Sequence, residues 1–324
     1  MNVLFCARSN LLTHPAGDTI QVQKSAEYLR QGGISVEIGP VPSAQSDYEV
    51  IHLWGLHPME EIYPAFERAR LSGAKIAVSP IYWNLSRYYT ALHSIDRLAQ
   101  WNWLCRFRRE ILQECDKIFV SGHLEMHSLQ QDIGVDLPYT VVPNGVDARV
   151  FHPKEEASAL QNSYILCAAR ICPRKNQLAL AKACAAMNRP LILAGSVGNQ
   201  RYLQQCLAYE QVQYAGVLDW EALSKLYEQA ELHVLASYVE TPGLATLEAA
   251  CMGCNVVSTA EGDASEYLKN LATYCDPYQA GSIEQAIADA LSHSFQPQLR
   301  QHLLAHYQWE ECLAPLLQGY QEWL

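Results

Sequence analysis

The sequence predicts an α/β protein made of two doubly wound domains in succession. Three observations predict this fold class. Apolar runs of four to six residues alternate with helical patterns along the chain, which is the rhythm of parallel βαβ units. The rhythm stops at a polar stretch near residues 154–163 and then restarts. The length of 324 residues suits two domains of about 150 residues better than one compact core.

The first half begins with a buried strand and ends in a tight turn. Its apolar runs predict strands at 2–7, 36–38, 50–53, 76–79, 117–120 and 140–142. Helical patterns predict helices at 19–31 and 60–71, one long helix from about 88 to 114, and a helix at 123–132. The turn signal Pro-Asn-Gly at 143–145 closes this half. We place the domain boundary in the polar stretch after it, between residues 155 and 156.

The second half repeats the alternation. It predicts strands at 164–169, 191–194, 212–214, 232–236, 255–258 and 272–275. It predicts helices at 176–187, 199–209, 219–229, 242–252, 264–268 and 282–292. The second domain therefore covers 156–307, and an aromatic-rich helix at 308–324 is expected to pack back toward the first domain, 1–155. Ligands of doubly wound sheets bind outside the carboxyl ends of the strands, so we expect a cleft between the two domains there.

Composition excludes several classes of protein. With 49% hydrophobic and 18% charged residues the chain is globular, and its net charge of −11 argues against nucleic acid as a partner. No apolar run approaches the ~18 residues of a membrane span, and the N-terminal apolar run is too short for a signal peptide. The 11 scattered cysteines suit reduced thiols, so we expect a cytoplasmic protein. Cys251 and Cys254 have redox-motif spacing, but we interpret them as core packing.

The segment from Glu240 to Glu248 is the most informative part of the chain. Thr241 is expected to cap the helix that follows Glu240, with Pro242 in its first position. The unpaired N–H groups of such a helix start favour a phosphate. If helical throughout, the segment spans about 12 Å, comparable to the reach from the sugar to the ribose of a nucleotide-sugar. A capped core helix with two solvated carboxylates is the structural alternative.

Two cations near the start of the second domain favour a diphosphate. Arg170 follows the predicted strand 164–169, and Lys175 directly precedes the next helix. A guanidinium can grip a diphosphate as a fork and an ammonium can bind it as a point charge. A solvated basic loop is the alternative, but the two carboxylates in the same domain favour a site. In the first domain Gly17 allows close backbone approach and opens a helix, which also favours an anion.

Taken in order, these motifs resemble the retaining GT-B glycosyltransferases of family 4 (glycosyl transferases group 1). The resemblance extends over nearly the whole chain and depends most on Glu240-x7-Glu248 with Arg170 and Lys175. Additional matching segments are 15–17, 120–121, 142–147, 194–195, 215–217, 253–257, 276–277 and 309–310. The resemblance implies the GT-B fold, with two Rossmann-like domains that face a central cleft.

The resemblance also implies roles for residues. Arg170 and Lys175 would bind the donor diphosphate and stabilise the leaving group, and Glu240 would contact hydroxyls of the transferred sugar. These three residues are the expected catalytic set. The expected donor-binding residues are Gly17, Gly195, Val217, Thr241, Pro242, Gly243, Leu244 and Glu248. Within that set the resemblance assigns the ribose hydroxyls to Glu248, the border of the base to Val217 and the cover over the phosphates to Gly17.

Chemically, the resemblance implies sugar transfer with retention, from a nucleotide-sugar to a glycan, lipid-linked or small-molecule acceptor. It implies neither a metal nor a further cofactor. The chain contains no Asp-x-Asp triplet, the metal-holding signature of the other common glycosyltransferase fold. Charge stabilisation by Arg and Lys agrees with that.

The family often carries a histidine near the transferred sugar, and this chain has Ile-Tyr-Trp-Asn at 81–84 where we expect it. Tyr82 or Trp83 is therefore an acceptor-side candidate. His52 and His57 are candidates from another loop, and for each of them a structural role is the alternative.

Two further alternatives concern partners. The aromatic and basic segment 101–109 indicates either contact with the inner membrane surface or an ordinary core-facing helix, and its spacing favours the core. A non-catalytic nucleotide-sugar-binding partner subunit would also retain the donor residues. A nicotinamide-dependent oxidoreductase is disfavoured, because no Gly-x-Gly-x-x-Gly follows a strand.

Overall fold

The computed structural model describes residues 1–41, 47–152, 164–293 and 297–323. Contacts divide the chain into two units. Unit 1 comprises Met1–Asn144 with Trp309–Leu324, and unit 2 comprises Gly145–Gln308. Each unit contains a six-stranded sheet with helices around it, so the predicted fold class is confirmed. The predicted boundary between 155 and 156 lies outside the described residues, while residues 145–152 already belong to unit 2.

Unit 1 is built on a parallel sheet with the order β2-β1-β3-β4-β5-β6. Its strands are β1 Asn2–Cys6, β2 Ser35–Ile38, β3 Val50–Trp54, β4 Lys75–Ser79, β5 Lys117–Val120 and β6 Thr140–Val141. Every residue of the inner strand β3 is buried, as expected when helices cover both faces of a parallel sheet. The continuous apolar runs in the sequence have the same origin.

The helices of unit 1 depart from the prediction in one place. They are α1 Gly17–Gln31, α2 Met59–Ser72, α3 Ser86–Ala91, α4 Ile95–Glu114 and α5 His123–Ile133. The single long helix predicted from about 88 to 114 is wrong, because α3 and α4 are separate. His93 has a left-handed backbone (φ 51°) between them, and a helix cannot continue through that conformation.

The C-terminal segment of unit 1 is also interrupted. It forms α13 Trp309–Cys312 and α14 Ala314–Gln321 in place of one helix over 308–324, and residue 324 lies outside the described residues. Pro315 in the first turn of α14 explains the break, since its ring has no N–H for a continuous helix. Tyr320 of α14 is fully buried and stacks on Phe119 of β5 at 5.9 Å between ring centroids, which anchors the segment on the first sheet.

Unit 2 has a second parallel sheet, with the order β12-β11-β10-β7-β8-β9. Its strands are β7 Ile165–Ala168, β8 Leu191–Ala194, β9 Val212–Gly216, β10 Leu232–Leu235, β11 Asn255–Thr259 and β12 Thr273–Cys275. Its helices are the 3-10 turn η1 Pro173–Lys175, then α6 Gln177–Ala186, α7 Gln200–Cys206, α8 Trp220–Gln229, α9 Leu244–Cys251, α10 Ala264–Leu268, α11 Ser282–Leu291 and α12 Pro297–His306.

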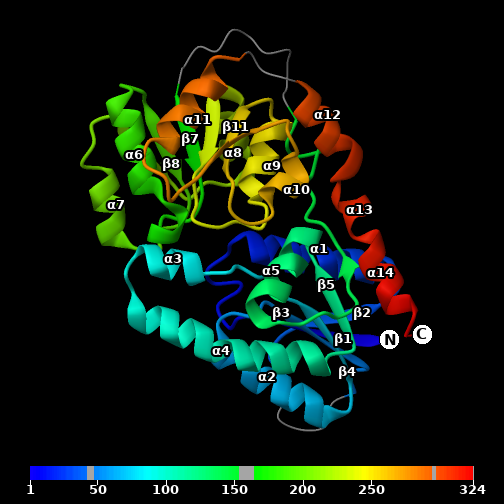
Figure 1. Ribbon diagram of the computed structural model, residues 1–324. Helices are drawn as coiled ribbons and strands as arrows, with labels where there is room; N and C mark the ends of the chain where they lie inside the picture. Colours follow the sequence, from blue (N-terminus) through cyan, green and yellow to red (C-terminus); the bar gives the residue numbers. More distant parts are fainter. Residues whose placement is uncertain (42–46, 153–163, 294–296, 324) are drawn as a thin grey trace. The chain divides into compact units, whose positions relative to one another are not determined.

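Two separate cores cover the two faces of the second sheet. One core joins the strands to α6, α7 and α11, and the other joins them to α8, α9, α10 and α12. Figure 1 shows α6 and α7 on one side of this sheet and α9 and α10 on the other. Helix α12 was not predicted. Its buried residues are Leu299 and Leu303, so its apolar pattern in the sequence is weak.

Candidate active site

Four of the predicted site residues lie along one edge of the second sheet. Arg170 follows β7, Gly195 follows β8, Val217 follows β9 and Glu240 follows β10. These four strands are neighbours in the sheet and run parallel, so their carboxyl ends meet at a common edge. The structure therefore brings together residues that are up to 70 positions apart in the sequence (170 to 240).

Glu240 is buried among cations at this edge. Its side chain is 4% exposed and contacts the ammonium of Lys175, and Arg174 Nη1 lies 3.9 Å from Glu240 Oε1. Burial alone would raise the pKa of Glu240, but the charges of Lys175 and Arg174 outweigh burial and hold that pKa below its ordinary value. Glu240 is thus an anion fixed beside two cations. Arg174 was not among the predicted site residues, although its place next to Lys175 was the available signal.

The backbone of Glu240 is held by the loop after β11. Glu240 forms an isolated parallel bridge with Gly262; its N–H donates to the carbonyl of Glu261 at 3.2 Å, and the N–H of Asp263 donates to its carbonyl at 3.0 Å. A Cβ added to Gly262 would lie 2.0 Å from the Glu240 carbonyl oxygen, and φ there is +90°. Only glycine fits so close an approach. This backbone bridge could not be predicted, because nothing in the order of residues pairs 240 with 262.

The turn between the two carboxylates differs from the prediction. Helix α9 begins at Leu244 with Gly243 as its N-cap, so the expectation that Thr241 caps the helix and Pro242 opens it is wrong. Gly243 has φ +85°, and a Cβ there would lie 2.6 Å from Leu235 Cδ2 and 3.7 Å from Glu240 Oε2. Close packing against β10 thus delays the helix start. The 12 Å helical span between the carboxylates no longer applies, because Glu240 is outside the helix.

Glu248 lies on α9 in a very different environment. Its half-buried carboxylate accepts a hydrogen bond from the Tyr227 hydroxyl at 3.0 Å. Desolvation raises the pKa of Glu248 to about 7, although the Tyr227 hydrogen bond acts in the opposite direction. The two carboxylates of the motif therefore have pKa values shifted in opposite directions, a pattern typical of sites in which two acids have different roles. Tyr227 was not predicted, and no sequence pattern links it to Glu248.

Arg170 lies at the same edge and is exposed. In the described part of the chain it forms no ion pair. Gln177 Nε2 donates to its carbonyl at 2.9 Å, and a Cβ on Gly195 would lie only 2.3 Å from the carbonyl oxygen of Ala169. The backbone before Arg170 is thus fixed while its charge stays available. Val217 is 71% exposed beyond β9, which leaves an apolar surface free at that end of the edge.

In unit 1 the start of α1 is already occupied. Gly17 is the first residue of α1, and the next residue, Asp18, accepts from the Thr19 N–H at 2.9 Å. Asp18 also takes two hydrogen bonds from Arg8, at 2.6 and 3.0 Å. A carboxylate of the protein thus satisfies part of the helix start that was expected to attract a phosphate. The role of Gly17 stays a prediction.

Two of the four acceptor-side candidates are structural. His52 is fully buried, with Nδ1 2.6 Å from the Tyr320 hydroxyl and Nε2 2.9 Å from the Ser79 hydroxyl, and burial lowers its pKa to about 3. Both nitrogens are used, so the structural alternative applies. Tyr82 is 3% exposed and its hydroxyl donates to Asp132. We therefore withdraw His52 and Tyr82 from the acceptor side.

His57 and Trp83 are placed differently. Both line a cavity of about 40 Å³ at the carboxyl edge of the first sheet, together with Trp54, Arg8 and Asp18. The Trp54 indole is 4% exposed, and its N–H has no acceptor among the described residues. The cavity therefore combines two indole rings, an exposed imidazole and a paired Arg and Asp.

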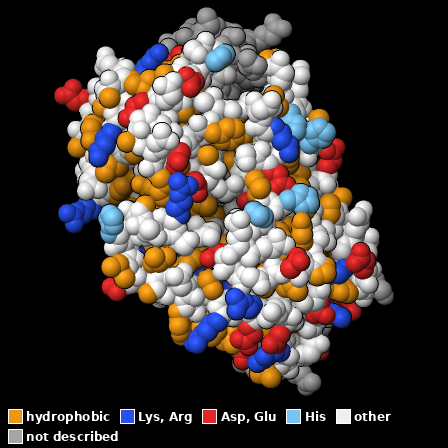
Figure 2. Space-filling model, viewed as in Figure 1, with side chains coloured by type: hydrophobic (Ala, Val, Ile, Leu, Met, Phe, Trp, Pro, Cys, Tyr) orange, Lys and Arg blue, Asp and Glu red, His pale blue; other side chains and the backbone are white. Residues whose placement is uncertain are grey.

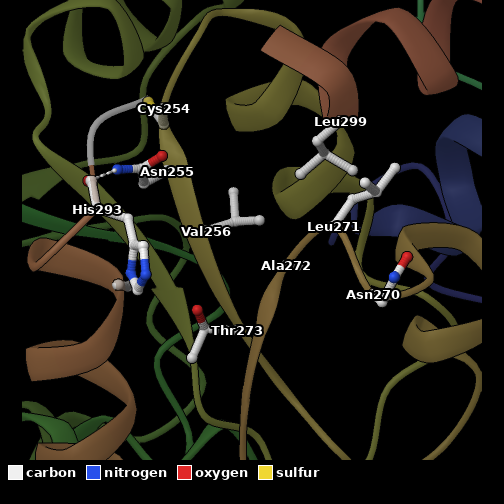
Figure 3. A pocket seen from close by; sticks show the side chains of 10 residues that line it. Cys254, Asn255, Val256, Asn270, Leu271, Ala272, Thr273, His293 and Leu299 are labelled. Carbon is white, nitrogen blue, oxygen red and sulfur yellow. Dashed lines mark hydrogen bonds between the residues drawn. The ribbon is translucent and has the colours of Figure 1, made fainter. Parts of the chain in front are cut away.

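A further cavity, of about 210 Å³, lies at the other edge of the second sheet. Figure 3 shows Asn255 and Thr273, which begin β11 and β12, among the side chains lining it, and Asn255 Nδ2 donates to the His293 carbonyl at 3.1 Å. Among the described residues that line it there is no Lys, Arg, Asp or Glu. Because it is at the amino ends of the strands, it is separate from the predicted site.

Other structural findings bear on ligands and partners. No cluster of three or more His, Cys, Asp or Glu in the described ranges could hold a metal, and metal independence stays a prediction. None of the described helices has the length and hydropathy of a membrane-spanning segment. On the face in Figure 2, Lys and Arg side chains are scattered among acidic and apolar ones. Cys251 and Cys254 are buried free thiols whose pKa values are raised by burial, as the packing interpretation requires.

The aromatic segment of α4 divides between core and surface. Trp101 is 4% exposed, and its ring lies under the guanidinium of Arg108 at 3.8 Å. Trp103 is 53% exposed, with the guanidinium of Arg106 at 4.2 Å from its ring centroid. The core interpretation holds for Trp101 and not for Trp103.

Comparisons with known proteins agree with this arrangement. Residues 149–304, nearly all of unit 2, match the family model described as glycosyl transferases group 1. Among curated protein sequences, none matches the chain. Sucrose-phosphate synthase from Thermosynechococcus elongatus is similar in structure, with a TM-score of 0.83 at 17% identity over 100% of this chain and 99% of that one.

Two other solved structures share the fold. Anabaena HepE in complex with UDP and glucose has a TM-score of 0.74 at 15% identity, covering 99% of this chain and 100% of that one. WaaG, a glycosyltransferase involved in lipopolysaccharide biosynthesis, has a TM-score of 0.64 at 15% identity, covering 96% and 94%. Residues 149–304 thus match the glycosyl transferases group 1 model, and the chain as a whole has the GT-B fold.

Proposed function

We propose that this protein is a retaining, metal-independent glycosyltransferase that moves a sugar from a nucleoside-diphosphate sugar to a carbohydrate, lipid-linked or small-molecule acceptor. The observation that carries the proposal is the contact between Lys175 and the buried Glu240 at the carboxyl edge of the second sheet. A diphosphate bound to Lys175 and sugar hydroxyls bound to Glu240 would lie side by side. The bond that joins them in a nucleotide-sugar is the bond that the transfer breaks.

The residues of the edge have complementary roles in this proposal. Arg170 and Lys175 stabilise the negative charge that develops on the leaving diphosphate. Glu240 accepts hydrogen bonds from the transferred sugar, because its lowered pKa keeps it ionised. Glu248 accepts from the ribose, Val217 borders the base, and the backbone around Thr241, Pro242, Gly243 and Leu244 contacts the sugar and diphosphate.

Transfer with retention needs attack from the face that the leaving group departs from. The bond between the anomeric carbon and the diphosphate oxygen breaks, and the acceptor oxygen forms its bond to the same carbon from the same face. The acceptor proton passes to the departing phosphate oxygen. No protein base is required, which agrees with the neutralisation of Glu240 by cations.

The acceptor side is proposed to include the unit 1 cavity with His57 and Trp83. The partly exposed indole of Trp83 suits the apolar face of a sugar, while the buried Trp54 ring stacks on His52 behind it. Arg8 is already paired with Asp18, so the cavity carries no spare cation for a charged acceptor group. The cleft expected between the two domains stays a prediction.

The donor is testable directly. The HepE structure is named as a complex with UDP and glucose, and the pneumococcal GtfA structure as a complex with UDP and GlcNAc, which supports a screen that starts from UDP-sugars. Thermal shift against UDP-, GDP- and ADP-sugars should raise the Tm for one donor class by mass action. Purified protein with that donor and a panel of sugar acceptors should then release the nucleoside diphosphate and form an α- or β-linked product of the donor's own configuration.

The main alternative is a non-catalytic nucleotide-sugar-binding partner subunit. It predicts the same thermal shift but no released nucleoside diphosphate, with or without acceptors. An inverted product would contradict retention, and activity lost in EDTA and restored by Mg²⁺ would contradict metal independence. No thermal shift with any nucleotide-sugar would contradict both candidate functions.

Peripheral membrane contact is a second and separate proposal for a cytoplasmic protein. The exposed Trp103 with Arg106 beside it is the observation that favours it, because such pairs suit anionic lipid surfaces. Sedimentation with vesicles containing anionic lipid should fall in Trp103→Ala. Trp220→Ala, which removes a tryptophan 60% exposed on unit 2, is the matched control. Equal sedimentation of both variants and the unmodified protein would contradict the proposal.

A further inference from the structure

Tyr227 is a buried aromatic residue that touches the proposed donor site with one atom. It lies on α8, is 1% exposed, and donates its hydroxyl to Glu248 Oε2 at 3.0 Å. Its ring makes edge contacts with Phe151 and His233, at 6.1 and 5.8 Å between centroids. Its own carbonyl accepts from the thiol of Cys254 at 2.8 Å. Ring and backbone are therefore both fixed, and the hydroxyl has a fixed position.

The position of the Glu248 carboxylate depends on this hydrogen bond, because the described residues around it supply no other. Within the described ranges it forms no ion pair, and the hydrogen bond from Tyr227 is the one that its carboxylate accepts. Its second oxygen, Oε1, accepts no hydrogen bond from a described residue. A carboxylate accepts up to four hydrogen bonds. One oxygen of Glu248 is thus held by the protein and the other has its capacity unused.

We propose that Tyr227 is a positioning residue for nucleotide recognition: it holds Oε2 of Glu248 so that Oε1 is available to the ribose hydroxyls of the donor. The inference rests on the proposed ribose role of Glu248 and goes beyond it. Without Tyr227 the glutamate would sample several rotamers, and nucleotide binding would have to restrict them. Preorganisation of a ligand-binding group strengthens binding by removing that loss of freedom.

The chain offers a matched control for the test. Tyr164 is also buried (7% exposed). Its hydroxyl donates at 2.8 Å to the carbonyl of Leu226, which lies on α8 next to Tyr227. Tyr164→Phe removes a buried tyrosine hydroxyl near α8 without touching Glu248. Any general effect of losing such a hydroxyl should be the same in Tyr164→Phe and Tyr227→Phe.

The experiment measures nucleotide affinity by isothermal titration calorimetry of the full chain. The probes are UDP, GDP and ADP and their 2′-deoxy forms, with unmodified protein, Tyr227→Phe, Tyr164→Phe, Glu248→Ala and the double variant Tyr227→Phe/Glu248→Ala. Tyr227→Phe should weaken the preferred ribonucleotide by about tenfold, the scale of one hydrogen bond to a charged group. It should weaken the 2′-deoxy form less, and it should have no further effect in the Glu248→Ala background.

Several outcomes would overturn the inference. Equal weakening by Tyr227→Phe and Tyr164→Phe would mean a packing effect, and additive losses in the double variant would mean that Tyr227 does not act through Glu248. If Tyr227→Phe does not fold, Glu248→Asp keeps the charge but retracts it from Tyr227, and unchanged binding by that variant would overturn the inference. Full affinity in Glu248→Ala would remove the ribose role too. Transfer assays of Lys175 and Glu240 variants would still decide separately whether the protein is a glycosyltransferase.

Discussion

The two sheets use the cation at their carboxyl edge in opposite ways. Arg8 follows β1, and its guanidinium donates to Asp18, to the Asn10 side chain at 2.7 Å and to the His14 carbonyl at 2.9 Å. Arg170 follows β7 and is exposed, with no ion pair in the described ranges. The same kind of residue at equivalent points of two similar units is satisfied by the protein in one and available to a ligand in the other.

This difference teaches which edge can bind a diphosphate. In unit 1 the cavity presents the partly exposed indole of Trp83 and the exposed imidazole of His57, which suit a neutral carbohydrate. In unit 2 the buried carboxylate of Glu240 pairs with two cations, Arg174 and Lys175, and Arg170 forms no ion pair in the described ranges, so this group carries positive charge in excess. Both units share the fold. Whether an edge can bind a diphosphate depends on whether neighbouring acidic side chains neutralise all of its cations.

The strongest way to break the comparison is to remove a cation from the second edge. Lys175→Ala should lower kcat by about 10³-fold, since Lys175 stabilises charge on the leaving group in a partly buried position. Steady-state release of nucleoside diphosphate measures the effect, and circular dichroism checks the fold. Lys182→Ala, an exposed lysine on α6, is the control and should retain normal turnover. A variant at 175 with near-normal kcat would end the proposed role of this edge.

A second test changes only the backbone seat of Glu240. Gly262→Ala forces a methyl group into the Glu240 carbonyl, so it should displace the carboxylate and lower kcat by about 10²-fold. Nucleoside diphosphate affinity should fall much less than kcat, because Arg170 and Glu248 do not depend on this bridge and, of the residues proposed to bind the nucleotide, only Lys175 contacts the displaced carboxylate. Titration calorimetry and turnover assays measure the two quantities.

Gly281→Ala separates sterics from backbone strain in that test. Gly281 also has a positive φ, +79°, but a Cβ there meets nothing within 4 Å. The Gly281→Ala substitution should lower the free energy of unfolding and leave kcat unchanged. If Gly281→Ala reduces kcat as much as Gly262→Ala does, the loss comes from general strain and the positioning role of Gly262 is wrong.

The first edge is tested through the acceptor. Trp83→Ala should raise the acceptor KM by about tenfold, the scale of losing one aromatic contact, without changing nucleotide affinity. Initial rates over a range of acceptor concentrations measure this, and Trp220→Ala on unit 2 is the control. An increase in the donor Kd instead would place Trp83 on the donor side and abolish the division between the two edges.

The sequence predicted the sheets well because their inner strands, such as β3, β7 and β10, are buried on both faces and appear as continuous apolar runs. All twelve strands of the described residues lie where apolar runs predicted them, within two residues at each end. The carboxyl-edge positions of Arg170 and Glu240 followed directly, since a residue after a parallel strand must lie at that edge. Helix ends were less predictable: Thr241 has the chemistry of a cap, but the close packing of Gly243 against Leu235 decides where α9 begins.

Contacts between distant segments of the chain could not be predicted from the sequence. Tyr227 reaches Glu248 and Gly262 supports Glu240 only because α8, α9 and the loop after β11 meet in three dimensions. Two histidines five positions apart also separate only in the structure. His52 points into the core beside Tyr320, 268 positions later, while His57 lines the cavity of unit 1. Long-range packing of this kind leaves no periodic signal in the sequence.

The smallest expected effect sharpens the comparison within unit 2, between its two carboxylates. The pKa of Glu248 is raised from 4.5 to about 7, so the folded state binds more protons than the unfolded state between these values, and stability falls as pH rises through that window. Glu248→Gln removes the ionisation. Near pH 4.5 the variant and the unmodified protein should have the same Tm. Above pH 7 the variant should be more stable, by about 1–2 kcal/mol in the free energy of unfolding after discounting for the partial exposure of Glu248.

Glu240→Gln should do the reverse, because the pKa of Glu240 is lowered by Lys175 and Arg174. A group with a lowered pKa stabilises the fold above its unfolded pKa, so this variant should lose stability at neutral pH and regain relative stability as pH falls through the lowered value. Thermal unfolding of both variants from well below pH 4 up to pH 8 gives the two curves. If both glutamines changed stability with the same sign at pH 8, the two ends of the motif would not differ electrostatically, and assigning one to the sugar and the other to the ribose would lose its physical basis.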